Sequence, residues 1–268
     1  TFDWKTDIFR ARQMVSERLT SMEEGLAPGV TPTMGPISSV MGEIMQIAIP
    51  IGAKPSGQKN AAPPLSAMDT REYADWVLRP RLMAIPGVAQ VIPIGGEVRQ
   101  FQVQPNTTRM SELGVTASDL DAALKGFSAN TSGGFLEING REYLIRNLGR
   151  TSRLDDLRNL PLAVRAGQPI LIHQVADVQF APAIKRGDAG FEGLPAVILG
   201  IQKQPTADTI ALTRSIESAL ADMKGSLPAG MAEPQVTFRQ ANFIEASIST
   251  LQGKLIGASV FVAVILFF

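Results

Sequence analysis

The chain has 268 residues, of which 45% are hydrophobic and 19% are charged, and this composition is typical of a globular protein with ample core. Its 25 basic and 25 acidic residues give a net charge of zero, which argues against a nucleic-acid surface because such a surface needs a basic excess. There is no cysteine and only one histidine, so thiol catalysis, disulfides and cysteine-based zinc sites are excluded.

Two helices are predicted in the first third of the chain. Residues 1–4 look like the end of a strand, and Asp7 can cap a helix over residues 8–22, where apolar residues recur at helical spacing. A second helix covers residues 71–85 (REYADWVLRPRLMAI), and Pro80 inside it predicts a kink or a new turn.

Between these helices, residues 42–51 (GEIMQIAIPI) predict a strand. Because side chains alternate along a strand, Met41, Met45, Ile47 and Ile49 should share one face, while Ile44, Gln46 and Ala48 share the other.

Glycine turns between strand-like runs predict three β-hairpins in the middle of the chain. VAQVIPI and EVRQFQV flank Gly95-Gly96, GFLEI and REYLIRN flank Asn139-Gly140, and PLAVRA and PILIHQVADVQF flank Gly167. Short helices are expected over residues 116–125 and 153–160. The middle of the chain is therefore predicted to be rich in β structure.

The last third predicts a buried strand from Leu194, a long helix over residues 207–224 and a short strand over residues 236–241. The helix and the turn after it resemble the first helix of the chain at an offset of 201 residues: Asp7 matches Asp208, Met22 matches Met223 and Gly29 matches Gly230. This repeat indicates two related α+β subdomains, each ferredoxin-like. The alternative is that two amphipathic helices look alike by chance.

The final stretch, Leu255 to Phe268 (LIGASVFVAVILFF), is apolar throughout. Fourteen helical residues span about 21 Å, whereas a bilayer core is about 30 Å thick. The stretch is therefore either a buried terminal helix or part of a membrane helix. Its lack of a polar face favours the membrane helix. The chain starts without a methionine or a signal peptide, so we expect an excised piece of a larger protein.

Three segments carry a resemblance to a known family. They are PGVAQVIPIGGEVRQFQV followed by GVTASDLDAALKG, VADVQFAPAIKRGDAGFEGLPAVILGIQKQPTADTI, and SLPAGM before an apolar helix. Together they resemble the porter domain of resistance-nodulation-division (RND) efflux permeases, over essentially the whole chain. GIQKQPTADTI and the short segment between Leu124 and Arg153 are most similar to the heavy-metal efflux branch, because drug exporters usually carry a longer docking hairpin there.

The resemblance implies an α+β fold with ferredoxin-like βαβ porter subdomains, an inserted β-rich docking subdomain and the start of a transmembrane helix. The implied boundaries are residues 1–36 for the end of the first porter subdomain, 37–103 and 186–241 for the two parts of the second, 104–185 for the docking subdomain, and 242–268 for the membrane helix.

The resemblance also implies a function. The chain would be the mostly periplasmic part of a bacterial inner-membrane homotrimer that joins a periplasmic adaptor and an outer-membrane channel. The pump would export heavy-metal cations as a proton antiporter, without a cofactor or enzymatic chemistry. Its proton relay would lie on membrane helices beyond Phe268. Two alternatives stay open: the same fold exporting amphiphilic organic compounds, and a membrane-tethered interaction domain without transport.

Candidate substrate and docking residues are few. The thioethers of Met41 and Met45 suit Cu(I) or Ag(I), although methionine also fills irregular core space. Phe101 is a candidate for lining an apolar cleft, with core packing as the alternative. Asn139 and Gly140 are candidates for docking at a hairpin tip, with a bare turn as the alternative.

The remaining polar candidates have plain structural explanations. His173 has no second histidine to join it in a metal site, so we expect a structural hydrogen bond. Asp188 and Glu192 near Lys185 and Arg186 suggest a surface of mixed charge. Asp119 and Asp121 lie at a helix start, where capping is expected.

Overall fold

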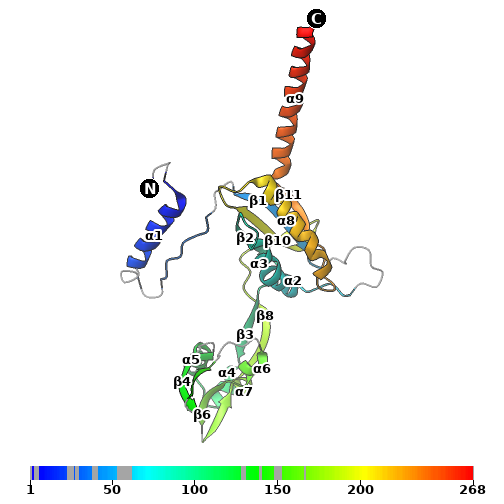
Figure 1. The fold of residues 1–268 in the computed structure, drawn as a ribbon. Coiled ribbons are helices and arrows are strands. Elements are labelled where there is room, and N and C mark those ends of the chain that lie inside the picture. Colours follow the sequence, from blue (N-terminus) through cyan, green and yellow to red (C-terminus); the bar gives the residue numbers. More distant parts are fainter. Residues whose placement is uncertain are drawn as a thin grey trace.

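The computed structural model describes residues 2, 6–22, 27, 30–37, 42–52, 62–127, 131–138, 141–147, 153–165 and 167–267, with the backbone alone for the strands between residues 131 and 147. Four parts are visible in Figure 1: a central sheet body, a lobe at one end of it, a long helix projecting from the opposite side, and a separate helix beside the sheet. The separate helix is α1 (Ile8–Met22), none of whose residues is buried.

The sheet body is ferredoxin-like, as the sequence predicts. Its four long strands follow the order β11-β1-β10-β2, and every neighbouring pair is antiparallel. A helical segment joins β1 to β2, and a helix joins β10 to β11, which completes a split βαβ arrangement. The bounds are β1 (Glu43–Pro50), α2 (Ala67–Tyr73), η2 (Ala74–Leu78), α3 (Arg79–Met83), β2 (Val88–Gly95), β10 (Leu194–Lys203), α8 (Thr209–Met223), η3 (Lys224–Ser226) and β11 (Gln235–Arg239), with the short β9 (Gly190–Phe191) paired to β10.

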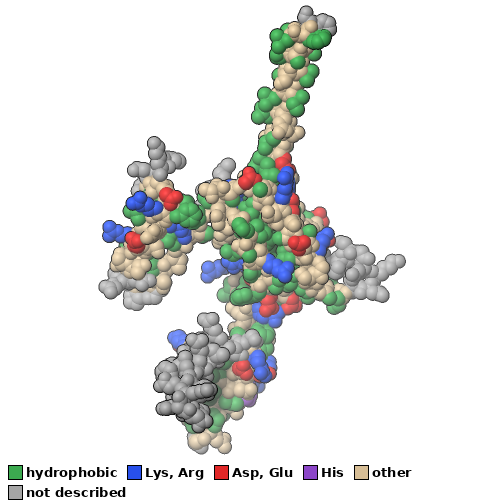
Figure 2. All heavy atoms as spheres, in the orientation of Figure 1, with side chains coloured by type: hydrophobic (Ala, Val, Ile, Leu, Met, Phe, Trp, Pro, Cys, Tyr) green, Lys and Arg blue, Asp and Glu red, His purple; other side chains and the backbone are tan. Residues whose placement is uncertain are grey.

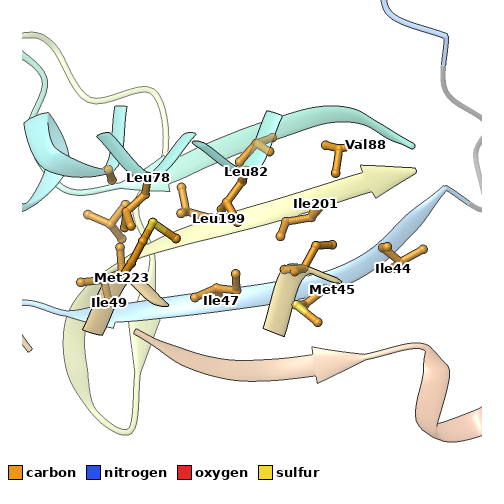
Figure 3. Close-up of a cluster of buried hydrophobic side chains, with 14 of the residues drawn as sticks. Ile44, Met45, Ile47, Ile49, Leu78, Leu82, Val88, Leu199, Ile201 and Met223 are labelled. Atoms are coloured by element: carbon orange, nitrogen blue, oxygen red, sulfur yellow. The ribbon is translucent and has the colours of Figure 1, made fainter. Parts of the chain in front are cut away.

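The helices cover one face of this sheet and form a hydrophobic core with it, which we call the porter core after the subdomain that the family resemblance implies. Figure 3 shows side chains of β1 and β10 meeting Leu78 and Leu82 from the helical segment and Met223 from α8. Leu199 and Ile201 of β10 are fully buried there. Burial of each such side chain contributes about 1.5–3 kcal/mol, so this core is the main source of stability of the sheet body.

The predicted alternation along β1 is wrong at its start. A register shift between Glu43 and Met45 shows a β-bulge, which turns two consecutive residues to the same side. Ile44 and Met45 are therefore both fully buried in the porter core, rather than on opposite faces.

Pro80 changes the helix as predicted, by starting a new segment. It has no N–H to donate to the carbonyl of Trp76, and its ring would clash with that carbonyl in a regular α-helix. The preceding residues Ala74–Leu78 form a π-helical turn, and α3 begins at Arg79.

The predicted hairpin around Gly95-Gly96 is wrong. β2 pairs with β10, whereas β3 (Arg99–Pro105) leaves the sheet body and pairs with β8 (Ala176–Pro182). The two glycines mark the point where the chain leaves one sheet and enters another.

The pair β3 and β8 leads into the insert between β2 and β10, which we call the docking lobe after the subdomain that the family resemblance implies (Figure 1). The lobe has its own core, separate from the porter core, around residues such as Leu120, Leu157 and Ile172. Its other elements are α4 (Thr107–Glu112), α5 (Ala117–Phe127), β4 (Thr131–Ile138), β5 (Arg141–Asn147), α6 (Leu154–Arg158), β6 (Pro161–Arg165), β7 (Gln168–Leu171) and α7 (Ile172–Val175).

Two predicted hairpins in this lobe are confirmed. β4 pairs with β5, and β6 pairs with β7 around Gly167. The run PILIHQVADVQF does not form one strand, because α7 separates β7 from β8.

The internal repeat predicted from the sequence can be compared at its two helices, α1 and α8. α1 and α8 each have 15 residues and each follow a capping aspartate: Asp7 Oδ1 accepts from the N–H of Arg10 at 2.9 Å, and Asp208 Oδ1 accepts from that of Ala211 at 2.7 Å. The strand predicted at residues 1–4 falls almost wholly outside the described residues.

The chain ends in α9 (Ala241–Phe267), which has 27 residues and starts upstream of the apolar run noted in the sequence. At about 1.5 Å per residue it is about 40 Å long, which exceeds the thickness of a bilayer core. By length and composition it is the one helix among the described residues that qualifies as a membrane span. In Figure 2 its projecting part shows hydrophobic and uncharged surface, while charged side chains gather at its base.

Candidate functional site

The junction between the sheet body and the docking lobe is built on Gly95 and Gly96. Both have positive φ, +81° and +67°, where residues with a Cβ are strained. A Cβ on Gly95 would collide with the carbonyl oxygen of Ala196, and one on Gly96 would lie 2.7 Å from Val197 Cγ2. The close approach of β2 to β10 therefore requires glycine here.

Arg99 and Arg71 connect this junction to helix α2 by hydrogen bonds and ion pairs. Arg71 donates from Nη1 to the carbonyl oxygen of Gly95 at 2.6 Å. Arg99 Nε lies 2.9 Å from Glu72 Oε2, and its Nη2 is paired with Asp69. The Arg99 guanidinium also lies over the ring of Phe180, 5.2 Å from the centroid.

A pocket of about 950 Å³ opens beside Arg71 and Arg99, between the helical segment α2–η2, strand β2 and the pair β3–β8. Phe101 lines it, next to Phe180, with the two ring centroids 5.1 Å apart. Phe101 also packs against the core of the docking lobe, and its role in a substrate cleft stays a prediction. We call this cavity the junction pocket.

A smaller pocket of about 410 Å³ is lined by Gly95 and Gly96 and by Lys185 and Arg186. Asp188 is 3.4 Å from Lys185 Nζ, so its charge is paired as the mixed-charge interpretation expects. Glu192 lies in the turn between β9 and β10, with φ of 51° followed by Gly193 at 79°. These two carboxylates belong to separate features and form no cation site together.

The methionine candidates have unequal outcomes. Met45 is fully buried in the porter core, and Met41 lies outside the described residues. No group of three or more His, Asp or Glu side chains converges as a metal site within the described parts of the chain.

The other candidates have local structural roles or lie outside the described region. His173 Nδ1 is 3.1 Å from the carbonyl oxygen of Arg158. Asp119 closes a capping box with Thr116 at the start of α5: it accepts from the N–H of Thr116 at 2.9 Å, and this hydrogen bond holds the pKa of Asp119 below its usual value. Asp121 pairs with Lys125 one turn along the helix. Asn139 and Gly140 lie outside the described residues.

A second polar cluster joins the sheet body to α9. Arg239, at the end of β11, donates from Nε to Glu217 of α8 and from Nη1 to Glu245 of α9, each at 2.7 Å. Nη1 is also 2.6 Å from Asn242 Oδ1. The hydrogen bond to Glu245 is the chief reason that the pKa of Arg239 rises further above its usual value. We call these four residues the helix joint.

The sequence did not predict the helix joint, and of the residues that line the junction pocket it singled out only Phe101 as a cleft candidate. One signal for the joint was available, since Arg239 and Glu245 are charged residues beside an apolar helix. For the pocket, one signal was Pro80, which disturbs the helix four residues after Trp76. Nothing in the sequence brings Phe180 next to Phe101, because their pairing depends on a strand contact between distant segments.

Comparison with known proteins places this geometry in a family. Residues 1–268 match the model of the AcrB/AcrD/AcrF family. The chain is 31% identical over 262 residues to the cobalt-zinc-cadmium resistance protein CzcA of Cupriavidus metallidurans, covering 98% of this chain and 24% of that protein. It is 30% identical over 269 residues to the cation efflux system protein CusA of Escherichia coli K12, again covering 98% and 24%.

The fold is also similar to a solved structure. The crystal structure of a heavy metal efflux pump superposes with a TM-score of 0.76 at 20% identity, covering 96% of this chain and 24% of that one. The chain thus spans about a quarter of the length of the relatives it matches. These matches confirm the resemblance to RND permeases and to their heavy-metal branch, and the chain belongs to the AcrB/AcrD/AcrF family.

Proposed function

We propose that this chain is the mostly periplasmic part of a bacterial inner-membrane pump that exports heavy-metal cations, with proton influx as the driving force. The similarity of nearly the whole chain to proteins named for cobalt, zinc, cadmium and cation efflux is the observation that carries this proposal. The 27-residue apolar helix α9, continuous with the sheet body, supports attachment to a membrane.

The proposed mechanism is alternating access, in which subdomains move as rigid bodies. Two observations support it. The sheet body and the docking lobe have separate cores, so each can keep its own packing while their relative position changes. Arg239 binds α8 and α9 at once, so a displacement of the membrane helix would be passed to the sheet body through the helix joint.

Within this mechanism the chain would line part of the transport path and transmit movement of the membrane helix. The described residues offer no cluster of metal ligands, and Met45 is enclosed in the core. As the family resemblance implies, the proton relay would lie on membrane helices outside this chain, and the metal-selecting ligands would lie mainly outside it as well.

The proposal includes the partners implied by the family. The pump would be a homotrimer, joined to a periplasmic adaptor and an outer-membrane channel. The docking lobe, including Asn139 and Gly140, would contact neighbouring subunits.

The test is deletion of the full-length gene in its host, followed by growth with copper, silver, zinc, cobalt or cadmium and with a panel of lipophilic dyes. We expect sensitivity to one or two metals and unchanged tolerance of the dyes. Sensitivity to dyes alone would instead support export of amphiphilic organic compounds. No sensitivity to either, with the undeleted host producing the protein at normal amounts, would support an interaction domain without transport.

A further inference from the structure

The junction pocket has the size and lining of a small-molecule site. Its volume of about 950 Å³ lies at the upper end of the range that holds drug-sized ligands. Apolar and aromatic groups form much of its wall, among them Ile92, Val98, Phe101 and Phe180. The tilted pair of phenylalanine rings offers an edge and a face against which a planar aromatic ligand can pack.

Trp76 extends this aromatic wall from the helix side. It lines the pocket, yet 77% of its surface is exposed, which is unusual for a side chain of this size. It lies in the π-helical turn Ala74–Leu78, and such turns occur often at functional sites. The turn exists because Pro80 cannot continue a regular helix, so the sequence itself places Trp76 at the pocket mouth.

The charges of the lining favour an anion. Three arginines and two carboxylates line the pocket. Arg71 is paired with Asp75 at 2.9 Å, and Arg99 is paired with Glu72. This leaves Arg79, which is half-buried and forms no ion pair with any residue in the described part of the chain. A partly desolvated guanidinium with no carboxylate partner is a binding site for a carboxylate, sulfonate or phosphate group.

We propose that the junction pocket binds an aromatic anion, whose ring packs among Trp76, Phe101 and Phe180 and whose charged group pairs with Arg79. Trp76 and Arg79 are three residues apart on one helical segment and both line the pocket, so one ligand of two fused rings can contact both. This site differs from a metal site, because its unpaired guanidinium repels metal cations and both carboxylates of its lining are already paired with arginines.

The test is photoaffinity labelling of the purified full-length protein in detergent. The probe is an azidonaphthalene sulfonate, and the matched probe is an azidonaphthalene of equal size that carries an alkylammonium group. After irradiation and proteolysis, mass spectrometry locates the adducts. We expect the anionic probe to label the peptides that contain Trp76 and Phe101, and excess naphthalene sulfonate to suppress this labelling.

Two arginine variants on the same helical segment separate a bound anion from simple hydrophobic labelling. Arg79→Gln should reduce labelling by the anionic probe about tenfold, and Arg79→Lys should restore part of it. Arg81→Gln is the control, because Arg81 is exposed and does not line the pocket, and it should leave labelling unchanged. Phe180→Leu should weaken labelling by both probes.

Equal labelling by the anionic and cationic probes would overturn the proposal, as would labelling that is unaffected by Arg79→Gln. Adducts confined to other peptides would also overturn it. None of these readouts depends on metal tolerance, so the outcome is independent of the proposed export of metal cations.

Discussion

Replacement of Met45 distinguishes a core methionine from a metal ligand. Met45 has no exposed surface and lies in the porter core, in register with Ile201 of β10. Met45→Leu keeps nearly the same volume and should change the free energy of unfolding by less than about 1.5 kcal/mol. Met45→Ala removes three heavy atoms from a closely packed site and should lower it by about 2–5 kcal/mol, because the cavity cannot fully collapse.

Both quantities can be measured on the full-length protein. Urea unfolding gives the change in stability, and growth of the host with copper or silver gives tolerance of soft metals. Met83→Ala serves as the control, because Met83 is 43% exposed and its truncation should cost no more than about 0.5 kcal/mol. We expect Met45→Leu to keep wild-type tolerance. Loss of copper or silver tolerance in Met45→Leu at unchanged stability would refute the assignment to the core and identify the thioether as a ligand.

Three further changes test the junction, the helix joint and the docking lobe. Gly167→Ala should lower the free energy of unfolding by about 1 kcal/mol, from the strain of positive φ alone, since no atom lies within 4 Å of the new Cβ. In Gly95→Ala the new Cβ meets Ala196 and Ala189, so the loss should be about 3 kcal/mol or more; equal losses in the two variants would contradict the close approach of β2 to β10. Arg239→Gln leaves Glu217 and Glu245 without their shared partner and should lower metal tolerance and protease resistance at the base of α9. Arg214→Gln should change neither, because the side chain of Arg214 is 70% exposed and its Nη2 lies 3.7 Å from Glu245; identical behaviour of the two variants would count against the helix joint. Because Thr116 lowers the pKa of Asp119 in the folded state, ionised Asp119 stabilises the fold fully at neutral pH, and this contribution is lost as the pH falls below about 3.9 through the folded pKa. The difference in urea midpoint between wild type and Asp119→Ala should therefore shrink in acid, and a constant difference from pH 7 to about pH 2.5 would refute this capping role.

Features set by neighbouring residues could be predicted from the sequence. The hairpins of β4 with β5 and of β6 with β7, the capping of α8 by Asp208 and the new helical segment at Pro80 each depend on a few adjacent positions. The ferredoxin-like body was also predicted, although through the repeat and the family resemblance rather than through strand patterns.

Features that depend on distant segments were missed. Gly95-Gly96 permits a tight hairpin, but it equally permits an exit from a sheet, and only the pairing of β3 with β8 decides between them. The bulge at the start of β1 shifts one residue against β10 and so reverses the face expected for Ile44. The junction pocket combines a helix, two strands of one insert and an edge strand, and no local pattern carries that combination.

The most direct test of the account is retention of metal by living cells. Cells with the gene deleted and cells that produce the full-length protein are loaded with the metal to which deletion gives sensitivity, and the metal content is followed over time by mass spectrometry, with and without an uncoupler that removes the proton gradient. The account predicts that producing cells lose metal faster than deleted cells and that the uncoupler abolishes the difference. Equal retention in both strains, with the protein present in the membrane at normal amounts, would contradict export by this protein.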